Sequence, residues 1–234
     1  GQIIDMQLSK NQRFLSLVLE DGTARVWDLE IGVQRPMIKT KKGTITALAA
    51  STQENTLYVA NESSVDAYDF LTAKLVSHLS INIPKINRME SSIDDSILVI
   101  NHDNNKLTAW ETKSKKQRWT SFISEGQAQQ IRITPNNLSL AILVRTPSLF
   151  SSSDQLEIRD LSTGSITKVL SNNDEKIISF DFSQTGTLNS IYENGDIINW
   201  DITTGKQISS TNLGNAVLTV SKAPNNVIAY AIDN

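Results

Sequence analysis

The stretch TARVWDLEIGVQ at residues 23–34 decides the fold of this chain, because a related stretch returns four more times along it. The later copies are SVDAYDFLTAKL (64–75), KLTAWETKSKKQ (106–117), LEIRDLSTGSIT (156–167) and IINWDITTGKQI (197–208). In each copy a short alternating run leads to an aromatic residue or Arg, then to an acid, a turn and a second run. The acids Asp28, Asp69, Glu111, Asp160 and Asp201 are 41, 42, 49 and 41 residues apart. Such a spacing indicates a repeated structural unit.

A second marker lies upstream in each unit, where a hydroxyl residue is followed by a polar turn and an apolar run. It reads SKNQRFLSLV from Ser9, STQENTLYVA from Ser51, TPNNLSLAIL from Thr134 and SQTGTLNSIY from Ser183, with the variant SSIDDSILVI from Ser91. Ser, Thr, Asn, Asp and Gly are the residues that favour tight turns. Each unit therefore predicts four antiparallel strands joined by turns and one loop.

Alternation with period two is common in these runs, and no long window has the apolar spacing of a helix. Four-stranded units of this length are typical of propeller blades. We therefore predict an all-β fold: a β-propeller of four-stranded antiparallel blades, in a single domain over 1–234. Five blades are complete and the first half of a sixth is visible. The predicted blades run over about 3–39, 44–80, 84–121, 128–170 and 176–211, with a partial blade at 216–234.

The pairs Trp27-Asp28 and Trp200-Asp201, with Thr163-Gly164 and Thr204-Gly205 after third strands, resemble WD-repeat propellers. The resemblance implies a protein-interaction platform rather than an enzyme. No Gly-His dipeptide precedes the first strand of any unit, so the hydrogen-bonded His, Asp, Ser/Thr and Trp network of that family is expected to be incomplete. Trp119 after a turn also resembles quinoprotein-like propeller repeats.

Composition excludes several classes of function. A net charge of −3 provides no field for nucleic acid, so we expect no nucleic-acid partner. No apolar run approaches the length of a membrane span, and we expect none. The absence of cysteine removes disulfides and thiolate chemistry, but leaves the compartment open. The cytoplasm is slightly favoured, and a periplasmic or lumenal location remains open.

Catalytic groups are scarce. The chain has two histidines, His78 and His102, which fall in different units and offer neither a zinc site nor a nucleophile–base pair. The repeated acids have a structural explanation, and the stretch around Asp103 does not have the spacing of a calcium loop. We expect no catalytic residues, no metal site and no cofactor.

The candidate binding residues lie in the loops expected on one face of the blades. The insertion 146–153 places an apolar tip, Leu149 and Phe150, among serines in the loop between the second and third strands of the fourth blade. Loops carry function more often than frameworks do, and aromatic anchors dominate interfaces. The remaining candidates for partner contact on that face are Lys41, Lys42, Asn82, Lys85, His102 and Asp103. Two basic clusters, around Lys41 and around Lys115, read first as solvated loops.

The functional hypothesis is a non-enzymatic scaffold within a larger protein or assembly, with protein partners. An unfinished blade exposes a strand edge, which proteins normally avoid. We therefore expect downstream residues or another chain to complete the propeller. A quinoprotein-like propeller enzyme and a periplasmic or cell-surface assembly factor are the alternatives.

Overall fold

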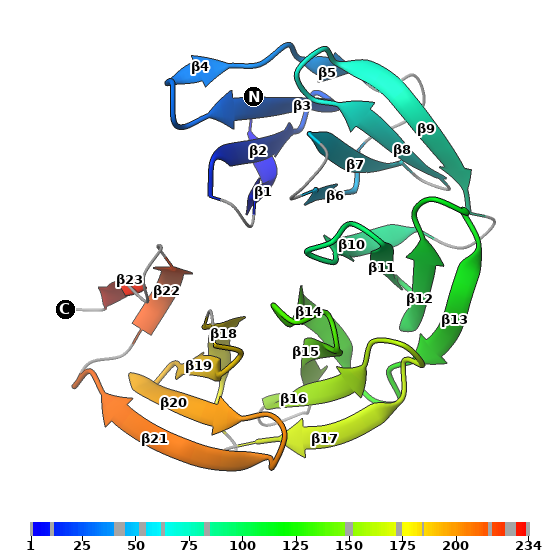
Figure 1. The fold of residues 1–234 in the computed structure, drawn as a ribbon. Helices are drawn as coiled ribbons and strands as arrows, with labels where there is room; N and C mark the ends of the chain where they lie inside the picture. Colours follow the sequence, from blue (N-terminus) through cyan, green and yellow to red (C-terminus); the bar gives the residue numbers. More distant parts are fainter. Residues whose placement is uncertain are drawn as a thin grey trace. The chain divides into compact units, whose positions relative to one another are not determined.

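The five repeated stretches form the third strand of five successive antiparallel sheets in the computed structural model of the chain (Figure 1). Every one of these strands ends at the predicted acid. They are β3 (Thr23–Asp28), β8 (Ser64–Asp69), β12 (Lys106–Glu111), β16 (Ser152–Asp160) and β20 (Asp196–Asp201). The acid marks the end of the strand because its carboxylate accepts hydrogen bonds from the turn that follows. The predicted all-β fold of four-stranded, propeller-type blades is confirmed.

The structure describes residues 2–9, 12–39, 45–51, 55–61, 64–81, 85–147, 152–171, 175–183, 185–214, 217–222 and 228–232. These residues fall into two compact units, Gly1–Phe122 and Ile123–Asn234. In the described part of the chain, no helix has the length and hydropathy needed to cross a membrane.

The first unit contains three sheets, whose strands pair in chain order. Sheet 1 has its outermost position filled by two short strands, β4 and β5, which both pair with β3. Its other strands besides β3 are β1 (Ile3–Leu8), β2 (Phe14–Leu19), β4 (Val33–Gln34) and β5 (Ile38–Lys39). Sheet 2 adds β6 (Ala47–Ala50), β7 (Thr56–Asn61) and β9 (Lys74–Ser80) to β8. Sheet 3 adds β10 (Ile86–Ser91), β11 (Ile97–His102) and β13 (Gln117–Phe122) to β12.

The second unit contains two further sheets of the same kind and one hairpin. Sheet 4 adds β14 (Gln127–Ile133), β15 (Ser139–Pro147) and β17 (Ile166–Leu170) to β16. Sheet 5 adds β18 (Ile177–Phe182), β19 (Leu188–Tyr192) and β21 (Lys206–Asn212) to β20. The hairpin consists of β22 (Val217–Lys222) and β23 (Ile228–Ile232). The hairpin resembles the first two strands of a sheet. Its first strand has a register shift at Val217/Thr219, as the first strand of sheet 5 has at Ile177/Ser179.

Apolar side chains between neighbouring sheets form the core of each unit. Sheets 1 and 2 enclose Phe14 and Phe70, whose rings lie 4.5 Å apart, together with buried valines and leucines. Sheets 2 and 3 enclose a second cluster that includes Val65, Leu98 and Ile100. In the second unit, Phe180, Tyr192 and their neighbours fill the space between sheets 4 and 5. Within each unit, the apolar face of one sheet is thus buried against the neighbouring sheet.

Two expectations about blade detail need correction. Thr146 and Pro147, taken as part of a flexible insertion, extend β15, and Ser152 and Ser153 extend β16 in register with them. The two nine-residue strands form a longer hairpin, because the added residues continue the ladder. The expected apolar tip at Leu149 and Phe150 lies outside the described residues.

The tryptophans of the WD-like pairs differ in burial, although each is the last residue before the acid that ends a third strand. Trp200 is 6% exposed between sheets 4 and 5, whereas Trp27 is 37% exposed. In β3 the apolar residues Ala24 and Val26 face sheet 2. Strand alternation therefore places Trp27 on the opposite face.

Candidate binding cleft between the second and third sheets

Five of the eight residues that the sequence singles out for partner contact lie outside the described residues. They are Leu149, Phe150, Lys41, Lys42 and Asn82. Their role in binding stays a prediction.

The other three candidates lie together at one end of sheet 3. The Asp103 amide donates a hydrogen bond of 3.0 Å to the Lys85 carbonyl, and both residues are exposed. His102 was expected in the loop, but it is the last residue of β11 and is only 1% exposed. Its side chain occupies an inward-facing strand position, where Nε2 lies 3.0 Å from the Thr108 hydroxyl. The loop placement is therefore wrong for His102, and only Lys85 and Asp103 present side chains for contact in this group.

Two indole N–H groups donate hydrogen bonds to buried hydroxyl groups within their own sheets. The Trp200 indole N–H donates to the Ser190 hydroxyl at 2.8 Å, and the Trp110 indole N–H donates to the Thr108 hydroxyl at 3.0 Å. His102 joins the second pair from β11, rather than from ahead of the first strand as in the family. These bonds hold each indole in one orientation, and the Trp110 ring thereby becomes a fixed wall of a surface cleft.

That cleft lies between sheets 2 and 3 and is the most informative feature of the surface of the first unit. Its apolar floor comes from both sheets, with Val65, Ala67 and Leu79 on one side and Leu98 and Trp110 on the other. The polar lining residues are Tyr58, Ser77, Glu111, Thr112 and Lys115. The cleft has a volume of about 20 Å³, which is room for a water molecule or a small aliphatic group.

Strand register explains why these side chains share one face. Tyr58 pairs with Ala67 and Ala67 with Ser77, so the three form one cross-strand row. Across the cleft, Leu98 pairs with Trp110. Paired residues in antiparallel strands project to the same side. The cleft is thus the solvent-open margin of the apolar core that sheets 2 and 3 share.

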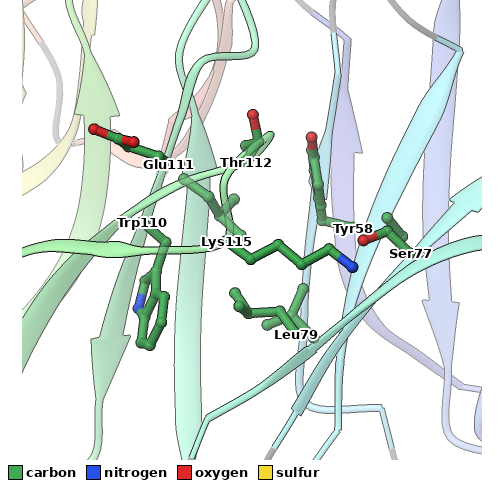
Figure 2. A pocket seen from close by; sticks show the side chains of 10 residues that line it. Tyr58, Ser77, Leu79, Trp110, Glu111, Thr112 and Lys115 are labelled. Carbon is green, nitrogen blue, oxygen red and sulfur yellow. The ribbon is translucent and has the colours of Figure 1, made fainter.

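The mouth of the cleft is formed by the tight turn that follows β12. The Lys115 amide donates to the Glu111 carbonyl at 2.8 Å, and Lys115 has a φ of 57°. Figure 2 shows the Lys115 side chain extended across the cleft toward Ser77, while the Glu111 carboxylate points away. The Ser114 hydroxyl donates to that carboxylate at 2.7 Å. Within the described residues, the Lys115 ammonium has no carboxylate partner.

Three more cations surround Lys115. Lys113, Lys116 and Arg118 lie on the same turn and at the start of β13, and all of them are exposed. We refer to Lys113, Lys115, Lys116 and Arg118 as the basic turn. Glu111 is the one acid within the segment 111–118, so this segment is positively charged in a chain with a net charge of −3.

The repeated acids act in the turns, as expected. The Asp160 carboxylate accepts hydrogen bonds from the Ser162 hydroxyl and the backbone, and these bonds lower its pKa from the ordinary value. Asp201 accepts from the Thr204 hydroxyl and the backbone, and its pKa is lowered in the same way. A carboxylate held ionised by turn donors is suited to closing the turn rather than to proton transfer.

A serine, a histidine and an aspartate are hydrogen-bonded in series on sheet 2, an arrangement that the sequence reading missed. His78 Nε2 lies 3.1 Å from the Ser80 hydroxyl, and Nδ1 lies 2.5 Å from the Asp66 carboxylate. Asp66 and His78 are register partners, and Ser80 follows two residues later on the same face. The order matches that of a nucleophile, base and orienting acid, but acyl transfer also needs donors placed for an oxyanion. Alternation places the group on the face of sheet 2 opposite to the cleft.

No group of three or more His, Cys, Asp or Glu side chains suited to a metal ion occurs among the described residues. Two ion pairs of the second unit are internal to sheet 4. Arg145 donates to Asp154 at 2.7 Å, and Arg159 donates to Glu157 at 2.6 Å with both side chains 1% exposed. The Arg145–Asp154 pair joins β15 to β16 through two hydrogen bonds, whereas Arg159 and Glu157 lie two residues apart on β16.

Comparisons with known proteins address the fold. No protein-family model matches the chain, and no curated protein matches its sequence. Solved structures with a matching fold number 1681 chains, so the fold is too common to identify a function. One of them is the hydrazine synthase of Kuenenia stuttgartiensis, with a TM-score of 0.75 and 12% identity over 94% of this chain and 70% of that chain. That protein contains a β-propeller, and at this identity the likeness shows that the chain shares its fold.

Proposed function

We propose that this chain is a WD-repeat-type propeller module that serves as a non-enzymatic platform for protein partners within a larger protein or assembly. The observation that carries the proposal is the cleft between sheets 2 and 3. It combines an apolar floor, a tryptophan held by a hydrogen bond and a lysine at its mouth that has no carboxylate partner among the described residues. Apolar floors with a polar and charged rim are the arrangement found at protein–protein contact sites.

The WD-like part of the proposal rests on particular contacts. The Trp200–Ser190 bond, which joins the third strand of sheet 5 to its second strand, supports the resemblance, and the Trp110–Thr108 bond lies within the third strand of sheet 3. The acids at the ends of the third strands occupy the position of the Asp in the Trp-Asp pair. These contacts stiffen the sheets, and a rigid framework lowers the entropy lost when a partner binds.

Affinity capture from an extract of the source cells tests the platform function. The purified chain should retain one or more proteins in near-stoichiometric amounts after washing, as measured by quantitative mass spectrometry. A heat-unfolded sample of the same chain is the control. Equal retention by the folded and the unfolded chain, or no retained protein, would contradict the proposal.

A second experiment separates the platform from an enzyme. A fluorophosphonate probe labels serines that a neighbouring base activates. Ser80 should stay unlabelled, as in the His78→Ala variant, because Ser80 and His78 are exposed on the outermost strand of sheet 2, where water competes for the hydrogen bond between them. Labelling of Ser80 that disappears in the variant would favour a hydrolase.

A further inference from the structure

We propose, resting on the platform function above, that the partner at this cleft is an extended acidic peptide segment with one small aliphatic side chain. The aliphatic group, of the size of alanine or valine, enters the cleft between Leu79 and Trp110. Carboxylates on either side of it meet the basic turn.

The apolar half of the proposal follows from the size and walls of the cleft. The floor residues Val65, Ala67 and Leu98 are 2%, 6% and 2% exposed, so they belong to the core and cannot retreat. The Trp110 ring is held by its bond to Thr108. A space of about 20 Å³ between such walls suits a small aliphatic group better than an aromatic ring.

The acidic character of the proposed peptide follows from the charged residues at the mouth of the cleft. Lys115 reaches across the opening, and the Glu111 carboxylate is turned away and bonded to Ser114 (Figure 2). The other cations of the basic turn are within three residues of Lys115 in the sequence and are exposed, and Ser77 and Tyr58 add hydroxyl groups to the lining. Cations without carboxylate partners in the described part of the chain complement a segment rich in Asp and Glu.

The backbone at Lys115 provides an independent argument. Lys115 is the fourth residue after the acid of its repeat, a position filled by Gly32, Gly164 and Gly205 in sheets 1, 4 and 5. All of these residues have a positive φ, which glycine adopts without the steric strain that a side chain causes. Ala73 fills the same position in sheet 2, so two of the five repeats have a side chain there, and at Lys115 this strained position coincides with the cleft.

The test measures peptide binding by fluorescence anisotropy. The probe is a fluorescein-labelled, acetylated peptide Asp-Asp-Val-Glu-Asp-amide. It is compared with a serine-for-valine peptide, a tryptophan-for-valine peptide and the uncharged Asn-Asn-Val-Gln-Asn-amide. The protein variants are Lys115→Gly and Lys115→Glu. Ala73→Gly is the matched control, because Ala73 occupies the same turn position in sheet 2 with a φ of 55°.

The acidic valine peptide is expected to bind. The serine, tryptophan and uncharged peptides should each bind several-fold more weakly than the valine peptide. Lys115→Gly should weaken binding by about two- to fivefold, the range for an exposed ion pair, and Lys115→Glu should weaken it further. Ala73→Gly should leave it unchanged. Binding should also weaken as the salt concentration rises. In the NMR spectrum, the indole N–H signal that Trp110→Phe removes should shift on titration with the peptide.

Equal binding of all four peptides, or no effect of the Lys115 variants, would overturn the inference. Partner capture distinguishes this failure from failure of the platform function. If the captured proteins remain bound to the Lys115→Glu variant, the platform function is kept, but the partner binds outside this cleft. If nothing is captured by any form of the chain, the platform function itself fails.

Discussion

Replacing Lys115 with glycine should raise the free energy of unfolding of the first unit, although it removes a side chain from the mouth of the cleft. Lys115 has a φ of 57°, and a left-handed conformation costs a residue with a side chain about 1 to 2 kcal/mol. Glycine removes this cost, but it loses more backbone entropy on folding, which lowers the stability by about 0.5 to 1 kcal/mol. The exposed Lys115 side chain has no ion-pair partner in the described residues, so little else is lost. The net expected gain is about 0.5 to 1 kcal/mol.

Urea unfolding followed by circular dichroism measures this change. The midpoint should rise at an unchanged slope, and the melting temperature should rise by about 1 to 4 °C for a chain of this size. The reciprocal change Gly205→Ala, at the same turn position with a φ of 75°, should lower the midpoint. A lower midpoint for Lys115→Gly would refute the reasoning, because it would mean that lysine packing outweighs the backbone strain.

Three other changes test the framework. Ser190→Ala should destabilise the second unit by about 1 to 3 kcal/mol in urea unfolding, because the buried Trp200 indole N–H loses its acceptor; no change would show that the bond is dispensable. Gly126→Ala should destabilise it by more than about 2 kcal/mol, since an added Cβ would lie 2.5 Å from the Arg145 carbonyl oxygen at a φ of 83°; a wild-type midpoint would contradict this contact. Hydrogen bonding to Arg13 and then Arg35 lowers the pKa of Asp28 to about 2. Because the folded state holds this carboxylate ionised, the associated stability is complete above about pH 4 and is lost as the pH falls toward 2. Acid titrations should therefore show a smaller stability loss over that range in Asp28→Asn than in the wild type, and identical curves would exclude the Arg13 bond as the cause.

The fold was predictable because each repeat carries its own boundary markers. The acid that ends β3, β8, β12, β16 and β20 is visible in the sequence, since a carboxylate is needed there to close the turn. The insertion in the fourth repeat was less predictable. A run of serines reads as a loop, but Thr146 and Ser153 pair across the hairpin and extend both strands. Ladder hydrogen bonding overrides the weak local preference.

The cleft was not predictable, because its walls come from two repeats and depend on side-chain orientation. Lys115 appeared in the sequence as one member of a solvated basic turn. Its direction across the cleft follows from the φ of 57° and from the bond of its amide to Glu111. One signal was available in the sequence, since aligning the repeats places Lys115 where three of them have glycine. His102 was misplaced because its polar neighbours resemble a loop, whereas Thr108 offers its imidazole a buried partner.

Site-specific photo-crosslinking in the source cells tests the central claim most directly. A benzoylphenylalanine replaces Ser77 in the cleft, and in a control chain it replaces Ser209, which has the equivalent strand position in sheet 5 and is exposed. The account predicts a discrete crosslinked protein at position 77 that is absent at position 209 and reduced by Lys115→Glu, with an acidic segment at the crosslinked peptide. No product at position 77, or the same product at both positions, would contradict a binding cleft between sheets 2 and 3.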